Sequence, residues 1–321
     1  MTKLLQLRVC FAALALACGA CGSTDTTGAA QDAGPKEPSA PQEPQAKFLP
    51  EVSGTCPGFK AGDGCTEDAT SLICTFQPKL VLKPRSVRVW FDPAAGSGDH
   101  PLVFFWHGLG GSASNAIAAG AGLGKTVTDD IIASGAIMVA LEKEDGRPVS
   151  ITALPWLAAL GRGADDDFLV MDEVLACADK ALGVDHRRIY TTGLSAGGLQ
   201  SGQVVAKRSG YIASAAIFSG GIDGEPKAQD PKNKLPVACF YGGPNDIVQP
   251  VHFEAEAMNE RMWLADHGNF SILCNHGMGH MVAATAALAG WQFLQDHPFG
   301  TVPSPYKKGV PKDFPADYCE L

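Results

Sequence analysis

The run Gly193-Leu194-Ser195-Ala196-Gly197 holds the residues most suited to chemistry in this chain. A β-branched and aromatic stretch, 188–192, precedes it, and an amphipathic stretch, 199–208, follows it. A serine flanked by glycines at a strand-to-helix turn projects its hydroxyl from the strand end. The pattern therefore predicts a nucleophile elbow with Ser195 as the nucleophile. A plain Gly/Ser loop is the alternative.

A serine nucleophile needs a base, a carboxylate that orients the base, and donors for the oxyanion. The predicted base is His280, which lies in a glycine-rich loop just past a predicted strand, with His276 as its competitor. The predicted acid is Asp246, because a buried strand and a Gly/Pro turn place it at the carboxyl edge of a parallel sheet, where active sites of open α/β folds collect. Asp223 and Asp230 are weaker rivals, since their surroundings resemble a surface loop.

Two backbone N–H groups are predicted to bind the oxyanion. One belongs to Ala196, which directly follows the nucleophile at the start of a helix. The other belongs to Leu109, in the glycine-rich loop 107–111, with Gly108 or Gly110 as alternatives. An ordinary glycine turn is the competing interpretation of this loop.

No cofactor or metal is expected. His276 and His280 have an H-x-x-x-H spacing that could bind a metal on a helix, but Gly277 and Gly279 disfavour a helix there.

Three side chains are candidates for contact with a substrate: His107, Trp156 and Met278. Trp156 lies in a connection, 148–163, that is longer than the ~2–6 residues typical of such units and could overhang the site. Core packing is the alternative for Trp156, and a structural role is the alternative for Met278. The remaining tryptophans considered are expected in the core: Trp90, Trp106 and Trp291.

The elements that position these residues alternate between strand and helix. Short apolar runs predict strands covered on both faces, and helical apolar spacing lies between them. An alternating stretch, 86–91, predicts a half-exposed antiparallel strand near the sheet edge. The buried strands are expected at 102–106, 136–141, 188–192, 213–218, 237–241 and 270–274, and the other helices after an acidic start at Asp165, over 252–267 and over 282–295. This order predicts an α/β fold with a mostly parallel, doubly wound sheet in a single catalytic domain, 53–321.

The N-terminus reads as an export signal, 1–21, with basic residues before a short apolar run. Small residues before Cys18 or Cys21 resemble a lipoprotein lipobox, so either cysteine is a candidate for lipidation and membrane anchoring; plain secretion is the alternative. A Pro/Ala/Glu-rich stretch, 22–52, is predicted to be a disordered linker. Export implies an oxidising compartment.

Net charge and cysteine spacing indicate which partners and ligands the protein is not expected to bind. The net charge of −9 and the absence of Lys/Arg clusters argue against nucleic acid. Seven cysteines follow the linker without paired C-x-x-C spacing, which favours disulfides over zinc and leaves at least one thiol free: Cys56, Cys65, Cys74, Cys177, Cys239, Cys274 and Cys319. The clustering of Cys56, Cys65 and Cys74 suggests that disulfides cross-link the N-terminal segment of the domain. The spacing does not determine which cysteines pair.

Four segments carry a resemblance to a known family: Pro101-Leu-Val-Phe-Phe-Trp-His107-Gly108, Asp185-His-Arg-Arg188-Ile-Tyr-Thr-Thr-Gly-Leu-Ser195-Ala-Gly-Gly, Gly-Gly-Pro-Asn-Asp246 and Gly-Met-Gly-His280. Together they resemble the poly(3-hydroxybutyrate) depolymerase and feruloyl esterase-like group of α/β-hydrolases over roughly 86–291. The resemblance implies the α/β-hydrolase fold, and a secreted serine esterase acting on polyesters or on acetylated or feruloylated polysaccharides. Leu109 and the Met-Val-Ala after His280 depart from that group's pattern, which leaves the substrate open.

The sequence thus predicts an exported serine carboxylester hydrolase with Ser195, Asp246 and His280 as its triad and an ester substrate. A prolyl oligopeptidase-like peptidase shares the triad order, although no block of sequence here supplies its usual extra domain. A non-catalytic, surface-binding lipoprotein on a hydrolase fold is the third possibility.

Overall fold

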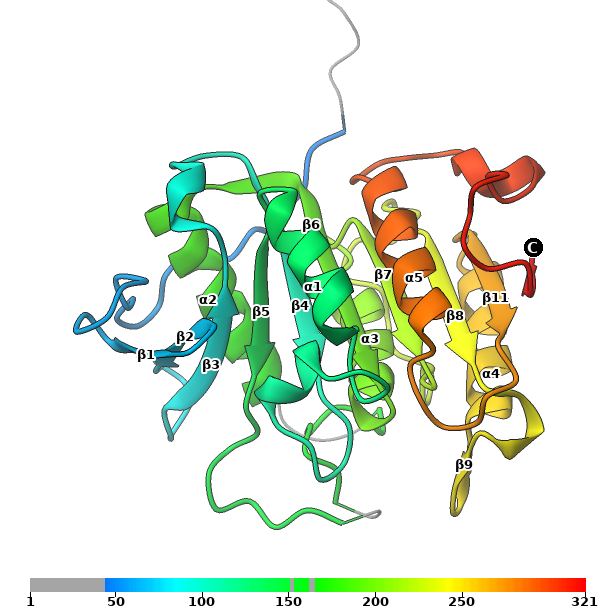
Figure 1. The fold of residues 1–321 in the computed structure, drawn as a ribbon, viewed down its shortest axis with the longest axis horizontal. Coiled ribbons are helices and arrows are strands. Elements are labelled where there is room, and N and C mark those ends of the chain that lie inside the picture. The colour runs from blue at the N-terminus through cyan, green and yellow to red at the C-terminus, as the bar shows by residue number, and fades with distance from the viewer. Residues whose placement is uncertain (1–43, 151–152, 162–164) are drawn as a thin grey trace, which may run out of the picture. The chain divides into compact units, whose positions relative to one another are not determined.

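The computed structural model describes residues 44–150, 153–161 and 165–321 (Figure 1). The predicted export signal, most of the predicted linker, and both Cys18 and Cys21 lie outside the described residues. Contacts divide the chain into two units, Met1–Gln42 and Glu43–Leu321, and the whole sheet with its covering helices belongs to the second.

A ten-stranded mixed sheet forms the centre of this unit, in the order β1-β2-β3-β5-β4-β6-β7-β8-β11-β12. The strands from β5 to β11 in that order pair in parallel, and the flanking strands pair antiparallel. The bounds are β1 Cys65–Asp68, β2 Ser71–Phe76, β3 Arg85–Trp90, β4 His100–Trp106, β5 Ile137–Leu141, β6 Val184–Leu194, β7 Ser214–Phe218, β8 Val237–Tyr241, β11 Ser271–Asn275 and β12 Cys319–Glu320, with β9 Ile247–Val248 and β10 Val251–His252 in a small separate ribbon. The prediction of a mostly parallel α/β sheet is confirmed.

Helices cover both faces of the sheet (Figure 1). Helices α1 (Gly124–Ala133) and α5 (Ala284–Asp296) lie on one face, and α2 (Asp166–Leu182), α3 (Ala196–Lys207) and α4 (Phe253–Asp266) lie on the other. Short 3-10 segments are η1 Pro93–Ala95, η2 Ala113–Ile117, η3 Gly243–Asn245 and η4 Pro305–Lys308. Strand β4 shows why continuous apolar runs fit this architecture, because Val103 and Phe105 pack on one side and Leu102, Phe104 and Trp106 on the other.

The amino-terminal part of the sheet differs from the expectation. Strand β3 is antiparallel as predicted, but the hairpin β1–β2 adds two strands outside it, so β3 is third from the edge. The sequence did not predict the hairpin, because β1 is a polar Cys-Thr-Glu-Asp run whose last three residues are exposed. It therefore lacks the alternation that marks a half-buried strand.

The described part of the chain contains three disulfides, as the cysteine pattern predicted. Cys65–Cys74 closes the β1–β2 hairpin, Cys274–Cys319 joins β11 to β12, and Cys56–Cys177 joins the segment before β1 to α2. Cys239 is free and buried in β8. Two of the three bridges thus involve the N-terminal cysteines, and one of these reaches a partner 121 residues away.

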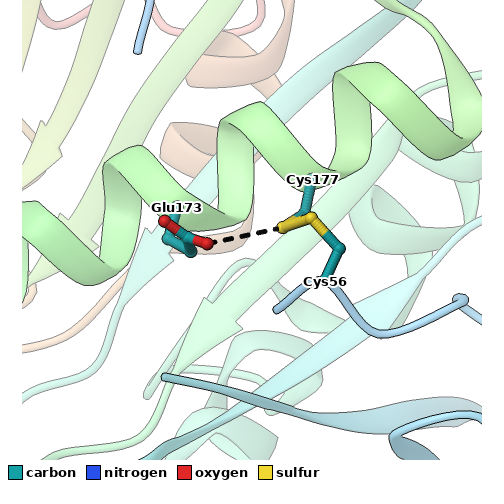
Figure 2. A group of neighbouring side chains, drawn as sticks. All are labelled: Cys56, Glu173 and Cys177. Carbon is teal, nitrogen blue, oxygen red and sulfur yellow. Dashed lines mark hydrogen bonds between the residues drawn. A yellow bond between two sulfur atoms is a disulfide. The ribbon is translucent and has the colours of Figure 1, made fainter. Parts of the chain in front are cut away.

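Glu173 reinforces the attachment of this segment to α2. Figure 2 shows its carboxylate beside the Cys56–Cys177 bridge. The carboxylate is buried and accepts hydrogen bonds from the N–H and hydroxyl of Ser53, at 2.9 and 2.6 Å, and from the N–H of Gly54 at 2.7 Å. Cys56, Glu173 and Cys177 have the composition of a metal site, but the two sulfur atoms are bonded to each other.

The described end of the predicted linker, 44–52, belongs to this second unit and packs on its core. Ala46 and Leu49 are partly buried against the core, and the N–H of Lys47 donates to the carbonyl of Gly210 at 2.6 Å. Among the helices of the described residues, none is long and apolar enough to span a bilayer.

Candidate active site

Ser195 occupies a sharp turn between β6 and α3. Its backbone has φ +62° and ψ −123°, a conformation that costs a non-glycine residue ~1–3 kcal/mol and recurs at functional sites. The flanking glycines are required by close backbone approach, since a Cβ on Gly197 would lie 1.9 Å from the carbonyl oxygen of Trp106, and one on Gly193 would lie 2.7 Å from the same atom. The turn therefore depends on both glycines of the pattern.

Four polar residues follow neighbouring parallel strands at one edge of the sheet. Ser195 follows β6, Ser219 follows β7, Asp246 comes after β8 through the η3 turn, and His280 comes after β11. Backbone bonds continue the ladder past the strand ends, from the N–H of Ser195 to the carbonyl of Phe218 at 3.1 Å and from Ser219 to Phe240 at 2.7 Å. Because these strands are adjacent and parallel, their carboxyl ends deliver these residues to one edge.

Asp246 and His280 are directly hydrogen-bonded. The Nδ1 atom of His280 lies 2.7 Å from Oδ1 of Asp246. The other carboxylate oxygen, Oδ2, accepts from the Ser219 hydroxyl at 2.7 Å and from the Gly242 N–H at 2.8 Å. Burial alone would raise the pKa of Asp246, but the bonds from His280, Gly242 and Ser219 outweigh burial and lower the pKa below its usual value. The carboxylate is thus held ionised although the residue is buried.

The ring of His280 is held on one face by Phe253, whose ring centroid lies 4.5 Å away in a stacked arrangement. Its loop is held by the N–H of Gly279, which donates to the carbonyl of Gly242 at 3.0 Å. A Cβ on Gly242 would come within 1.9 Å of the Gly279 carbonyl oxygen, so this contact also needs a glycine. The side chain of His280 keeps 23% of its surface exposed, which leaves the ring accessible at the sheet edge.

The rival acid and base candidates make other contacts. His276 accepts a hydrogen bond from the N–H of Met278 at 3.2 Å, and burial lowers its pKa. Asp230 pairs with Lys47 at 3.2 Å. His280 is therefore the histidine that bonds Asp246.

The loop after β4 lies next to the elbow. A Cβ on Gly108 would lie 3.2 Å from the Cβ of Ser195 and 3.7 Å from its hydroxyl oxygen. The next residue is Leu109, whose N–H donates to no other group in the described part of the chain. Ala196 is the first residue of α3, so its N–H has no partner within the helix. The Leu109 N–H thus belongs to the residue after Gly108, which lies beside Ser195, and the Ala196 N–H belongs to the residue directly after Ser195.

Two of the predicted substrate contacts are wrong, because His107 and Trp156 are 0% and 1% exposed. The indole of Trp156 donates to the carbonyl of His107 at 2.8 Å and packs edge-on against Trp106, with centroids 4.9 Å apart. Burial lowers the pKa of His107 to about 4, so its ring is neutral near neutral pH. Both side chains support the loop from inside the core, whereas Met278 is 59% exposed and stays a candidate for substrate contact. Trp90, Trp106 and Trp291 are buried as predicted.

Ser219 is the residue that sequence reasoning missed. It is fully buried, has φ +42°, and donates to the carboxylate that holds His280. Its sequence signal was its place directly after the buried strand β7, the same position that Ser195 has after β6.

Solved structures share this architecture at low sequence identity. A native structure of a protein named pOPH matches with a TM-score of 0.59 and 17% identity over 82% of this chain and 96% of that chain. A thermostable esterase matches with a TM-score of 0.54 and 18% identity over 71% of this chain and 63% of that chain. A ferulic acid esterase matches with a TM-score of 0.51 and 16% identity over 70% of this chain and 96% of that chain.

No protein-family model and no curated protein matches the chain. At these identities the structural likeness establishes the fold. The strand order, the two helix layers and the turn at Ser195 agree with that likeness. The chain therefore has the α/β-hydrolase fold.

Proposed function

We propose that this protein is a serine carboxylester hydrolase with Ser195 as nucleophile, His280 as base and Asp246 as the acid that orients it. The observation that carries the proposal is the 2.7 Å bond between His280 and Asp246 at the edge where Ser195 occupies its strained turn. The likeness to proteins named as esterases points the same way.

In this mechanism His280 takes the proton of the Ser195 hydroxyl as the oxygen attacks the ester carbonyl. The N–H groups of Leu109 and Ala196 stabilise the oxyanion of the tetrahedral intermediate, which collapses to an acyl-enzyme as His280 gives its proton to the departing alcohol. His280 then takes a proton from a water molecule that attacks the acyl-enzyme, and it returns this proton to Ser195 as the acid leaves. Asp246, held ionised by its three donors, stabilises the imidazolium that forms in both steps.

We further propose that the natural substrates are polyesters or polysaccharide-linked acyl or feruloyl esters, and that the protein is exported and secreted or lipid-anchored. The substrate proposal is supported by the likeness to a protein named ferulic acid esterase and by the sequence resemblance to the depolymerase group. A panel of acetyl, feruloyl and hydroxybutyrate esters would separate these classes by their kcat/KM values.

The direct test replaces Ser195 with alanine. We expect wild-type protein to hydrolyse p-nitrophenyl acetate and to react with a fluorophosphonate probe, and Ser195→Ala to lose both. Ser214→Ala is a matched control, because Ser214 is a buried serine on β7 whose hydroxyl has no hydrogen-bond partner within the described ranges. Full ester hydrolysis by folded Ser195→Ala, or a folded wild type that does not react with the probe, would overturn the proposal. A faster reaction on amide than on ester substrates would favour a peptidase.

A further inference from the structure

The loop between β2 and β3 exposes two leucines between two lysines. Its sequence over 77–84 is Gln-Pro-Lys-Leu-Val-Leu-Lys-Pro, in which Leu80 is 78% exposed and Leu82 is 95% exposed. Single exposed apolar residues are common on protein surfaces and need no explanation. Two large apolar side chains this exposed within three residues form a local apolar tip.

The exposure of these leucines is built into an ordered loop. Val81, between them, is buried in the core and its N–H donates to the carbonyl of Pro78 at 3.1 Å. The side chain of Gln77 donates to the carbonyl of Val81 at 2.6 Å, and the N–H of Lys79 donates to the hydroxyl of Ser53 at 3.2 Å. Because Val81 points inward and the loop is hydrogen-bonded on both sides of it, Leu80 and Leu82 are held outward.

The loop carries positive residues, whereas the chain as a whole is negatively charged. The chain carries a net charge of −9, but 77–84 contains Lys79 and Lys83 and no acidic residue. Lys83 pairs with Glu144 at 2.8 Å, whereas Lys79 is exposed and forms no ion pair with any described residue. Exposed leucines beside lysines suit the boundary between anionic headgroups and acyl chains.

The loop lies at the same edge of the sheet as the proposed catalytic residues. Strand β3 runs antiparallel to β5, so its first residue, Arg85, lies beside the carboxyl end of β5 and bonds the carbonyl of Glu142 at 3.3 Å. A cavity of about 500 Å³ adjoins the loop. It is lined by the charged residues Lys83, Glu144 and Arg147 and by apolar residues of the connection that follows β5, such as Leu154, Trp156 and Leu160. In Figure 1 this connection is the green segment that hangs below the sheet.

We propose that Leu80, Leu82 and Lys79 form a docking tip for an anionic phospholipid surface, which turns the carboxyl edge of the sheet toward the membrane. The leucines enter the interface and the lysine contacts lipid phosphates. This contact is separate from any lipid on Cys18 or Cys21, and it does not require that the protein be an esterase.

The test uses the chain from Glu43 onward, because that unit holds the whole sheet and its covering helices and lacks the apolar N-terminus. Co-sedimentation with vesicles of phosphatidylcholine mixed with phosphatidylglycerol measures binding. Vesicles of phosphatidylcholine alone carry no net charge and measure the apolar part, so the difference between the two vesicle types gives the electrostatic part. We expect Leu80→Ser/Leu82→Ser to weaken binding about tenfold or more. We expect Lys79→Ala to weaken it about fivefold and to reduce its salt dependence.

The matched control is Met258→Ser/Met262→Ser, which removes two exposed apolar side chains from α4 and should bind within about twofold of wild type. Hydrolysis of p-nitrophenyl acetate by the leucine variant should match wild type, and a loss there would report on folding or the catalytic site instead. Vesicle binding that is absent, or that the leucine variant retains in full, would overturn the proposal. So would leucine-dependent binding to polyester particles alone, or a leucine-dependent dimer without vesicle binding.

Discussion

Two buried carboxyl groups beside β8 differ in protonation: Asp246 is ionised and Glu260 is protonated near neutral pH. Asp246 lies past the end of the strand and receives three hydrogen bonds, and these lower its pKa. Glu260 faces the middle of the strand from α4. One of its oxygens accepts only the weak thiol donor of Cys239 at 3.4 Å, and the other has no partner among the described residues. Burial raises the pKa of Glu260 to about 8.

The difference teaches that the number of donors, not burial alone, decides whether a buried acid stays ionised in this protein. Asp246 is arranged to stay charged beside a histidine, and Glu260 is arranged to stay protonated in an apolar layer. A site that needs a permanent negative charge must therefore bring donors from several strands, as the turns after β7 and β8 do here.

The largest effect is expected from removing the charge of Asp246. Asp246→Asn should lower kcat/KM for p-nitrophenyl acetate by about 10³–10⁴-fold, because the amide can neither stabilise the imidazolium nor select the same tautomer of His280. Steady-state kinetics measure this loss, and thermal unfolding checks the fold. Glu260→Gln is the control and should retain wild-type kinetics. A loss of less than tenfold in Asp246→Asn would show that the charge does not serve catalysis.

The next effect concerns stability and comes from Glu260. A raised pKa in the folded state contributes stability that is complete below the unfolded pKa and is lost as pH rises through the folded pKa. Wild type should therefore lose stability between about pH 4.5 and about pH 8, and Glu260→Gln should not. At ~1.4 kcal/mol per pKa unit, the variant should be more stable by on the order of 3 kcal/mol near pH 7.

Urea unfolding across that pH range measures the Glu260 effect. Asp266→Asn changes an exposed carboxylate near the end of the same helix and should shift the free energy of unfolding by no more than about 0.5 kcal/mol. A Glu260→Gln protein whose stability falls with pH as steeply as wild type would contradict the assignment.

The smallest effect is expected from Ser219, which supplies one of the three donors. Ser219→Ala should raise the pKa of Asp246 and lower kcat/KM about tenfold, because a hydrogen bond to a charged group contributes ~1.5–3 kcal/mol. A lowered pKa contributes stability that is lost as pH falls through the folded value, so this acid loss should begin at higher pH in the variant.

Ser214→Ala separates this role from the loss of any buried hydroxyl near β7, because the Ser214 hydroxyl has no hydrogen-bond partner in the part of the chain that the structure describes. The control should keep both the activity of wild type and the pH at which wild type loses stability in acid. If both variants behaved alike, Ser219 would have no positioning role.

Much of the fold was accessible from local sequence. Strand β8 and helix α4 were predicted to within a residue or two, because continuous apolar runs and helical apolar spacing report directly on burial. The turn at Ser195 could also be predicted, because its two glycines and its serine lie within five consecutive residues. The β1–β2 hairpin was not, because its polar strand is held by a disulfide rather than by a buried face.

The sequence by itself determined the alternation of strands and helices, the glycine-flanked serine and the acid and histidine that follow later strands. These depend on side chains near one another in the chain. Only the tertiary structure decided that Ser219 completes the Asp246 site, that Trp156 and His107 lie inside the core, and that Cys56 pairs with Cys177. Those outcomes depend on which distant segments pack together, and local spacing carries no information about that packing.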